Sequence, residues 1–474
     1  MSKLGLGKGS ASGVALDKET IKSALALADV DYCEVRFENS EVLSIGYQGR
    51  GLDRISQDRL FGGAVRALWK GGWGFVSFNS PAELPDVVRA ACRQARFTGD
   101  QQNGASKLAA APVVEEDYRP AWTLNPRGVT LDEKVRILDR YKDLILGYDP
   151  AITAAAIIYG ERVTDLTFAN TDGTFIHQEK VDIGASLSAT ARRGATTVTK
   201  GIGRGSSIGF DCMLGADEEL RETCDLAVRL LDAPQVKAGV YTVVCDPAVA
   251  GLFVHEAFGH LSEADNAYRN PDLAKAMTLG RRLGRDILTI YDTGEQPEHR
   301  GYLRYDDEGV RTRRTYLVKD GILVGRLHSR ETAGVMGEPP SGSARALNYT
   351  FPPIVRMRNT SIAAGESTFE EMLAGVELGV YAVGSGGGQT NGEMFSFNAG
   401  HGFMIRDGKL AELVKDVKLM GNVFTTLENI DMVGRDAKGR GGAGGCGKGG
   451  QMPLPTSGVC PPIRIQNVII GGAK

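Results

Sequence analysis

The sequence lacks several features that would point to a particular partner or compartment. Neither sign of charge is in excess, because 55 Lys and Arg residues oppose 58 Asp and Glu residues, for a formal net charge of −3. We find no basic stripe of the kind that marks nucleic-acid-binding proteins. No apolar run is long enough to span a bilayer, and residues 1–7 show no signal-peptide pattern. We therefore expect a cytoplasmic protein with no nucleic-acid or membrane partner.

Cysteine is scarce and is not arranged for a disulfide framework. The count is odd and no CxxC pair occurs; the seven are Cys33, Cys92, Cys212, Cys224, Cys245, Cys446 and Cys460. Scattered cysteines of this kind are typical of proteins in a reducing compartment, where thiols stay free or bind metals.

The 474 residues are enough for two or three domains. We predict an α+β fold in which an N-terminal antiparallel sheet with flanking helices precedes a β-rich C-terminal domain that carries the metal-site helix. The expected parts are an N-terminal α+β subdomain (1–99), a linker (100–130), a middle α+β subdomain (131–235) and the C-terminal domain (236–474).

Periodicity and turn residues indicate the main elements. Helices are expected over 20–28, 81–96, 132–146, 217–231 and 248–262. Strands are expected over 31–37, 41–47, 62–69, 73–78, 152–159, 166–170, 174–191, 241–245 and 463–470. The run Asn170-Thr171-Asp172-Gly173 predicts a hairpin turn, and Asp246-Pro247 predicts the N-cap and first position of the 248–262 helix.

The strongest chemical signal lies on that last helix, at His255, Glu256 and His260. Zinc binds neutral imidazoles, and a carboxylate beside the metal can take a proton from the attacking water. In the common HExxH pattern the histidines are at i and i+4; here they are at i and i+5, about 140° apart on a straight α-helix. They converge if the turn widens into a π-bulge, for which Gly259 gives backbone freedom. The alternative is an amphipathic core helix with two incidental histidines.

A catalytic zinc usually takes three protein ligands, and the residues leave the third open. Glu263 and Asp265 follow on the same segment. Cys446 lies in the glycine-rich loop 441–451, and Cys460 precedes Pro461-Pro462. The loop also matches nucleotide-binding patterns by chance, but Gly449 stands where a P-loop needs Ser or Thr.

A second glycine run, Gly386, Gly387 and Gly388, follows the strand-like residues 380–383. It is either a bulge or tight turn, or a place where an extended peptide substrate approaches bare backbone. We predict the second, with Gly386, Gly387 and Gly388 as substrate-binding residues.

At these residues the chain resembles the TldD branch of the TldD/PmbA peptidases over nearly its whole length. The resemblance rests on HEAFGH at 255–260, GGGQ at 386–389 and CGKGGQ at 446–451. It implies a Zn²⁺ held by His255, His260 and Cys446, with Glu256 as general base. It also implies cleavage of unfolded or extended peptides inside a closed dimer, formed with a metal-free TldE/PmbA-like chain or with a second copy.

We predict Cys446 rather than Cys460 as the third ligand. Glycines on both sides of Cys446 allow its loop to bend toward the helix, and nearby Lys448 favours a thiolate. Pro461 stiffens the chain after Cys460 into an extended form. Two other functions stay open: a metal-dependent amidase acting on a non-peptide bond, and a non-catalytic partner subunit of the same fold.

Overall fold

The structure, a computed structural model, describes residues 16–101, 106–440 and 442–471. Residues 1–7, which show no signal-peptide pattern, lie outside these ranges, as does part of the expected 100–130 linker. None of the helices in the described ranges is both long enough and apolar enough to cross a membrane.

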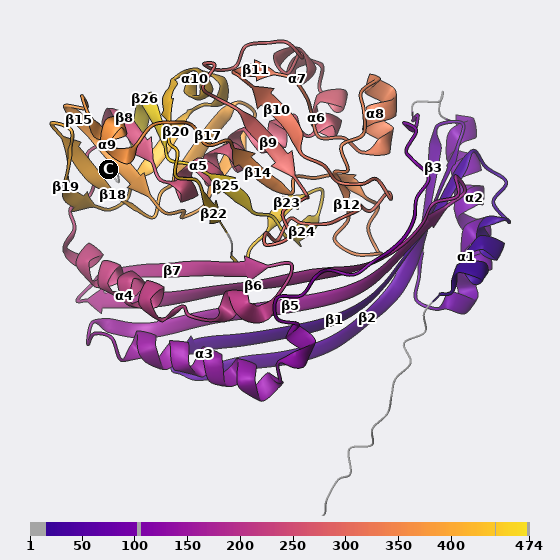
Figure 1. Ribbon diagram of the computed structural model, residues 1–474, viewed down its shortest axis with the longest axis horizontal. Helices are drawn as coiled ribbons and strands as arrows, with labels where there is room; N and C mark the ends of the chain where they lie inside the picture. Colours follow the sequence, from indigo (N-terminus) through magenta and orange to yellow (C-terminus); the bar gives the residue numbers. More distant parts are fainter. Residues whose placement is uncertain (1–15, 102–105, 441, 472–474) are drawn as a thin grey trace, which may run out of the picture.

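One long sheet occupies the N-terminal half of the chain. Its strands are β1 (Tyr32–Gly49), β2 (Gly51–Trp69), β3 (Gly72–Phe78), β4 (Glu115–Tyr118), β5 (Ile152–Asn170), β6 (Phe175–Arg193) and β7 (Thr196–Ser206). Their spatial order is β3-β2-β1-β5-β6-β4, and β7 also pairs with β6. Because β1 pairs with β5 from Glu34↔Asn170 to Gly49↔Ala155, strands expected in two subdomains are neighbours in one sheet. The sheet curves beneath the rest of the molecule (Figure 1).

Helices cover the two ends of this sheet. They are α1 (Lys18–Leu25), α2 (Leu84–Gln101), α3 (Leu131–Leu146) and α4 (Asp217–Asp232), with short 3-10 helices at Pro81–Glu83, Pro126–Gly128 and Phe210–Met213. In α3, Leu138, Tyr141 and Ile145 recur at helical spacing and are buried against Leu43 and Ile45 of β1. Helices α1 and α2 bury their apolar faces against the other end of the sheet (Figure 1).

A second sheet forms the centre of the C-terminal half. Its strands are β8 (Gly239–Cys245), β15 (Leu378–Val383), β16 (Gly388–Asn391), β17 (Met394–Asn398), β18 (His401–Arg406), β19 (Lys409–Val414), β20 (Lys418–Asn422), β21 (Ile430–Val433) and β26 (Ile463–Gly471). The order is β16-β17-β20-β26-β8-β15-β18-β19, with β21 paired to β26. The final strand β26 therefore lies inside the sheet, between β20 and β8.

Smaller strands and short helices complete this half. The strands are β9 (Ile290–Thr293), β10 (Thr315–Lys319), β11 (Ile322–Leu323), β12 (Ala344–Arg345), β13 (Ile354–Val355), β14 (Asn359–Ile362), β22 (Lys438–Arg440), β23 (Cys446–Lys448), β24 (Gln451–Leu454) and β25 (Gly458–Cys460). The helices are α5 (Pro247–Phe253), a π-helix (Val254–Gly259), a 3-10 helix (His260–Ser262), α6 (Ala264–Arg269), α7 (Pro271–Ala276), α8 (Arg330–Met336), α9 (Phe369–Leu373) and α10 (Val423–Glu428).

The predicted fold class is confirmed: an antiparallel N-terminal sheet with flanking helices precedes a β-rich half that carries the metal-site helix. The hairpin turn after Asn170 is also present, with Gly173 at φ 101°. The expected strand bounds are wrong in β1, β2 and β5, where the runs 152–159 and 166–170 also form one strand. The runs 31–37 and 41–47 form one strand, and the strand expected over 62–69 begins at Gly51. Residues 51–61 escape detection because they lie exposed at the sheet margin and so lack apolar alternation.

Candidate metal centre

The helix that carries His255 and His260 begins as predicted. The Asp246 side chain accepts a hydrogen bond from Val249 N at 2.7 Å, and Pro247 occupies the first turn of α5. The α-helix then widens into the π-helix Val254–Gly259, where the His260 N–H donates to His255 O. The wide turn expected from the i, i+5 spacing is therefore present, and it brings both imidazoles to one side.

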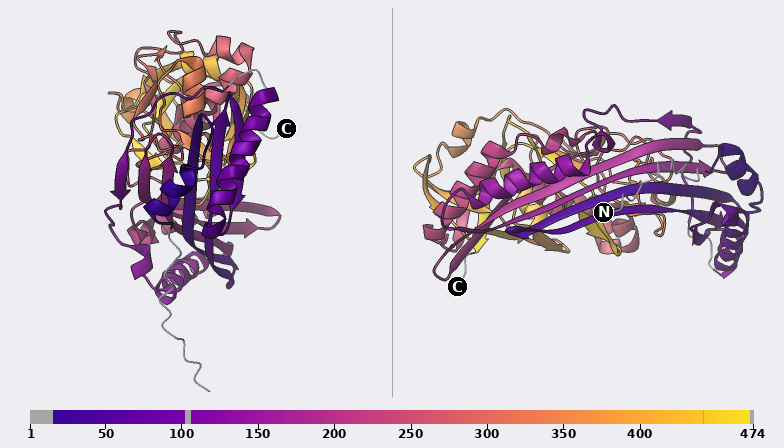
Figure 2. Two further views of the ribbon diagram at one scale, coloured as in Figure 1. Left: turned by 90° about the vertical axis from the view of Figure 1, so that its right-hand side faces the viewer. Right: turned by 90° about the horizontal axis from the view of Figure 1, so that it is seen from below.

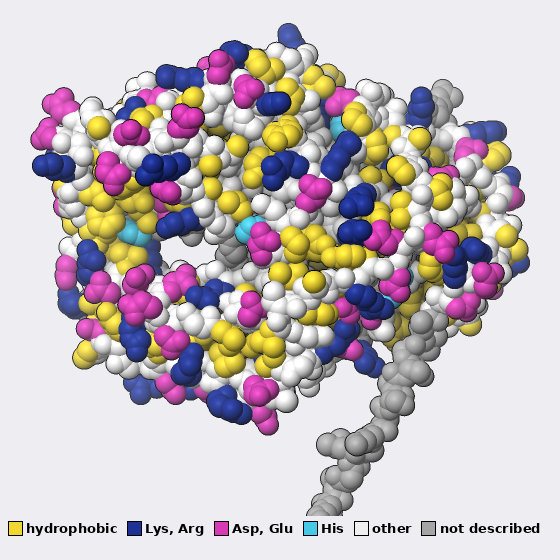
Figure 3. Space-filling model, viewed as in Figure 1, with side chains coloured by type: hydrophobic (Ala, Val, Ile, Leu, Met, Phe, Trp, Pro, Cys, Tyr) yellow, Lys and Arg dark blue, Asp and Glu magenta, His cyan; other side chains and the backbone are white. Residues whose placement is uncertain are grey.

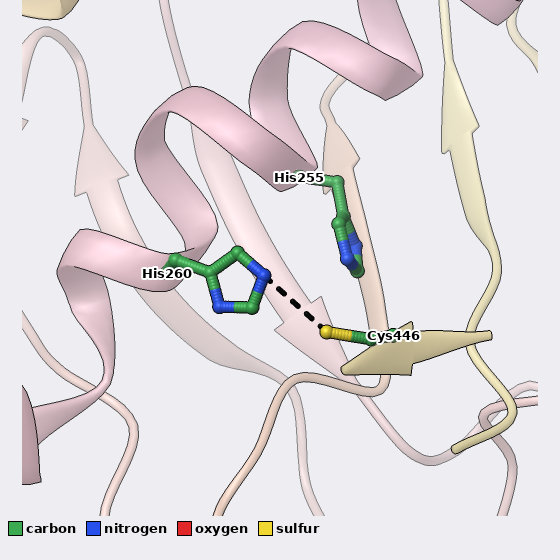
Figure 4. A group of neighbouring side chains, drawn as sticks. All are labelled: His255, His260 and Cys446. Carbon is green, nitrogen blue, oxygen red and sulfur yellow. Dashed lines mark hydrogen bonds between the residues drawn. The ribbon is translucent and has the colours of Figure 1, made fainter. Parts of the chain in front are cut away.

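Three side chains converge beside this turn. The ring centroids of His255 and His260 are 5.4 Å apart, and Cys446 Sγ lies 3.3 Å from His260 Nε2. One donor atom from each of the three residues lies within 4.8 Å of the others. Figure 4 shows the imidazoles and the thiol pointing toward one another from the helix and from β23. His255 and Cys446 are buried, and the His260 side chain is 26% exposed.

Gly259 serves the turn for a different reason from the one expected. Its φ and ψ of −57° and −47° are ordinary helical values, so the conformation does not require glycine. A Cβ at this position would instead lie 2.1 Å from Met357 Sδ. The glycine is needed because Met357 packs directly against the backbone of the wide turn.

Cys446 is held by a hairpin of β23 and β24 in which it lies opposite Leu454. The fully buried guanidinium of Arg356 donates from Nη2 to Cys446 O at 2.7 Å and from Nη1 to Gln451 O at 3.2 Å. The Gln451 side chain donates to Pro352 O and accepts from Leu347 N. These contacts fix the hairpin and thereby the position of the thiol.

The opposite nitrogen of His260 contacts Glu263. His260 Nδ1 and Glu263 Oε2 are 3.1 Å apart, and Lys448 Nζ lies 3.0 Å from Glu263 and 2.6 Å from Asp265. Burial raises the pKa of Glu263, but its contacts with His260 and Lys448 outweigh this and hold that pKa below its ordinary value. The ammonium of Lys448 therefore lies between the two carboxyl groups and pairs with both, and Glu263 orients His260.

The surroundings of His260 favour positive charge. Burial lowers the pKa of His260, but hydrogen bonds to Cys446 and Glu263 outweigh burial and raise that pKa to about 10. A thiol sulfur and two imidazoles are donors that zinc prefers. Their spacing and the carboxylate behind His260 fit a zinc ion with three protein ligands, with Glu263 fixing the ring orientation.

Glu256 lies beside the three donors without being one of them. Its Oε2 is 3.9 Å from His260 Nε2, and its side chain is 29% exposed. The carboxylate is thus partly exposed to solvent on one side of the three donors.

The predicted glycine segment lies next to the same turn. Gly386, Gly387 and Gly388 are exposed, and Gly387 has φ 84°. Asn398 links the segment to β17 through Gly386 N and Gly387 O, at 2.7 and 2.9 Å. The segment leads into β16, the marginal strand of the second sheet, and Thr390 Oγ1 donates to Glu256 O at 2.9 Å.

The remaining predicted candidates lie elsewhere. Cys460 is 1% exposed within the main hydrophobic core and pairs opposite Lys438. Asp265 faces Lys448. Among the described residues, the side chains whose donor atoms lie close enough together to hold a metal ion are therefore those of His255, His260 and Cys446.

A cavity of about 470 Å³ adjoins the hairpin but is not lined by the three donors. Its walls come from the long sheet, including Ser44 and Lys180, and from the C-terminal half, including Arg300, Met452 and Leu454. Figure 3 shows an opening between these two layers of the molecule. The donor chemistry, rather than the size of this cavity, identifies the functional centre.

Sequence reasoning missed Arg356 and Met357, which support the centre from a distant segment. It named Glu263 only as a possible metal ligand. The three-residue spacing between His260 and Glu263 could have indicated that their side chains are in contact. No local sequence pattern connects Arg356 with Cys446.

Comparisons with known proteins give a consistent result. Family models match three stretches: PmbA/TldA metallopeptidase domain 1 over residues 33–95, the central domain over 124–233 and the C-terminal domain over 238–472. A metalloprotease from Synechocystis sp. is 43% identical over 445 residues, covering 94% of this chain and 96% of the relative. A zinc metalloprotease TldD homolog from Saccharolobus solfataricus is 27% identical, covering 88% and 93%.

Solved structures share the fold. A crystal structure of a Thermotoga maritima protein superposes with a TM-score of 0.77 at 20% identity, covering 96% of this chain and 99% of the other. TldE from Thermococcus kodakarensis superposes with a TM-score of 0.74 at 17% identity, covering 96% and 100%.

Proposed function

The chain belongs to the PmbA/TldD family of metallopeptidases, and we propose that it is a zinc-dependent peptidase that hydrolyses unfolded or extended peptides. The observation that carries this proposal is the convergence of His255, His260 and Cys446 within 4.8 Å, with Glu256 partly exposed beside them. The name of the Saccharolobus relative, which specifies zinc, supports the choice of metal.

The chain's own residues have separable roles in this proposal. When bound, zinc polarises the peptide carbonyl and lowers the pKa of the attacking water. His255, His260 and Cys446 hold the ion, and Glu263 keeps the His260 ring in place through Nδ1. Glu256 takes the proton from the attacking water and returns it to the leaving amine as the C–N bond breaks.

Substrate is proposed to lie extended along Gly386, Gly387 and Gly388. These residues lack side chains, are exposed, and continue into a marginal strand that contacts the backbone of Glu256. A marginal strand offers backbone hydrogen bonds to a peptide of almost any sequence. A folded protein offers few free extended segments that could pair with this strand, so binding here would favour unfolded chains.

The role of Glu256 is tested by Glu256→Gln, which keeps the size of the side chain and removes the base. We expect the variant to retain zinc after dialysis and to lose about 10²–10⁴-fold in turnover of an unstructured peptide. Glu393→Gln, at an exposed turn position, is the matched control and should behave as the native chain. Near-native turnover by zinc-loaded Glu256→Gln would rule out this role.

We also propose that the chain works in the cytoplasm as a dimer, with a metal-free TldE/PmbA-like chain or with a second copy. The similarity of TldE to this fold supports a partner of related shape. None of the seven cysteines forms a disulfide, which fits a reducing compartment. Cell fractionation, and size measurement of the chain alone and co-expressed with such a homologue, test these points. A fully active monomer would contradict the dimer.

A further inference from the structure

Two cysteines of the N-terminal half, distant in the sequence, are in contact. Cys33 is the second residue of β1, and Cys92 lies in the middle of α2. Their side chains are joined by a hydrogen bond, and both are free thiols. A disulfide needs two sulfur atoms that already lie close together, so this contact distinguishes the pair from a cysteine that only fills space in the core.

Glycines bring the helix that carries Cys92 close to the sheet. A Cβ at Gly74 of β3 would lie 2.1 Å from Ala91 O, and a Cβ at Gly72 would lie 2.1 Å from Gly99 N. The backbone of α2 therefore rests directly on β3. Figure 2 shows α2 lying along the indigo strands at this end of the sheet. The close packing holds Cys92 against β1.

The two thiols are not equivalent. The hydrogen bond from the Cys33 thiol and one from the Asp29 N–H lower the pKa of Cys92 to about 7, although burial raises it. The same hydrogen bond to Cys92, together with burial, raises the pKa of Cys33. Cys33 is therefore the donor, and Cys92 is the thiol that ionises near neutral pH. The thiolate is the form of cysteine that reacts with oxidants.

A thin surface segment covers the reactive sulfur. Cys33 and Cys92 are 0% and 3% exposed, but Asp29, whose N–H contacts Cys92, is an exposed residue of the loop between α1 and β1. An ion pair of 2.5 Å between Arg96 and Asp29 holds this loop on α2. Exposed loops open locally more often than the sheet beneath them, so a small oxidant can reach Cys92 without unfolding of the chain.

We propose that Cys33 and Cys92 form a reversible redox site, in which hydrogen peroxide converts the two thiols into a disulfide that joins β1 to α2. This inference goes beyond the proposed peptidase function and does not depend on it, because no residue of the metal centre takes part. Disulfides in reducing compartments are usually transient and redox-sensing, which fits a bond that forms only under oxidation.

The reaction has two steps. The Cys92 thiolate attacks one oxygen of hydrogen peroxide; an S–O bond forms, the O–O bond breaks, and the departing hydroxide takes up a proton to become water. The Cys33 sulfur then attacks the sulfenic acid on Cys92. An S–S bond forms, the S–O bond breaks, and the hydroxyl leaves with the Cys33 proton as a second water. The two thiols lose two electrons, and the peroxide gains them.

The first experiment treats the folded, full-length chain with hydrogen peroxide and maps its peptides by mass spectrometry without reduction. We expect a cross-linked peptide that contains Cys33 and Cys92 and disappears on treatment with dithiothreitol. Cys224 of α4 is the internal control. Burial raises the pKa of its thiol to about 11, so it should be oxidised at least about 10-fold more slowly. Oxidation of Cys224 as fast as Cys92, or no cross-link between Cys33 and Cys92, would overturn the proposal.

Single variants separate the two roles. In Cys33→Ala the oxidation of Cys92 should stop at the sulfenic acid, which dimedone traps, whereas in Cys92→Ala residue 33 should stay a thiol. Cys224→Ala is the matched control, because it removes another buried cysteine, and it should form the cross-link as the native chain does. Circular dichroism checks that each variant is folded. Dimedone labelling of Cys33 in the Cys92 variant would contradict the assigned order of attack.

Thermal unfolding gives a measurement that needs no variant. The disulfide would restrict the unfolded chain between β1 and α2. The oxidised native chain should therefore unfold at a higher temperature than the same chain after reduction with dithiothreitol. An unchanged unfolding temperature in a sample shown to contain the cross-link would contradict a bond formed between thiols already in place.

Discussion

Two buried cysteines near the end of the chain have different surroundings. Both belong to the hydrophobic core of the C-terminal half, but Cys446 Sγ faces His260 Nε2 at 3.3 Å, whereas Cys460 lies on β25 opposite Lys438. The thiolate of Cys446 would add negative charge to the zinc, which makes the metal a weaker Lewis acid and increases the need for Glu256 as base.

Replacing Cys446 and Cys460 with serine, one at a time, should distinguish the proposed zinc ligand from the core residue. We expect Cys446→Ser to lose both zinc and activity after dialysis, because an alcohol is a poor zinc ligand. Cys460→Ser should keep both, while its buried hydroxyl lowers the free energy of unfolding by about 1–3 kcal/mol. Elemental analysis and thermal unfolding give the two readouts. Loss of zinc in the Cys460 variant alone would reverse the assignment.

His255, Glu256 and His260 could be recognised from the sequence because they lie within one turn and carry their chemistry in their spacing. Cys446 could be assigned only through the glycine-rich motif, since its approach to the helix is tertiary. Arg356 and Met357 could not be predicted. The contact of Arg356 with Cys446 O and that of Met357 with Gly259 join distant segments, and neither leaves a pattern in the local sequence.

Of the secondary-structure elements, the π-helix was the easiest to predict from the sequence. Residues 51–61 of β2 were the hardest. The i, i+5 spacing requires a wide turn if both histidines are to face one ion, and the structure contains that turn. The polar residues 51–61 carry no apolar alternation, so their strand conformation is set by pairing with β1 rather than by burial.

Strand β16 and its glycine run allow a test of substrate binding. Gly387 has φ 84°, and a Cβ there would meet open space, so Gly387→Asn adds a side chain in a conformation that Asn tolerates. We expect the KM for an extended peptide to rise by about 10-fold, equivalent to ~1.4 kcal/mol, with zinc content unchanged.

Gly392 provides the matched control for this strand. It has φ 60° and equally open surroundings in the turn between β16 and β17. Gly392→Asn should therefore leave the KM unchanged. Equal KM values for Gly387→Asn and the native chain would place the substrate elsewhere.

Across the whole molecule, Arg300 connects the long sheet to the loop that precedes Cys446. Its guanidinium pairs with Asp182 of β6 at 2.6 and 2.8 Å and donates to Gly444 O at 2.6 Å and to Gly442 O. The curved sheet therefore supports the metal centre although it supplies no ligand.

Removing this connection should loosen the third ligand. We expect Arg300→Ala to weaken zinc binding by about 10-fold or more, the usual cost of losing a contact that positions a ligand. Arg304→Ala is the control, because Arg304 also contacts the sheet region, through Glu116 at 2.7 Å, but not the loop. Competition with a chelator gives the affinities, and equal affinities for the two variants would contradict the proposed support.

The position of β26 inside the second sheet sets the order in which a newly made chain can mature. This last strand fills the space between β20 and β8, and Cys446 follows His260 by 186 positions in the chain. Contacts over such a separation form late, after a large loop has closed. During translation the sheet stays incomplete and the three proposed zinc donors stay apart until residues 446–471 have left the ribosome. A chain that terminates before Cys446 would therefore lack the third donor of the proposed metal site, so interrupted synthesis would not release a fragment with the proposed activity.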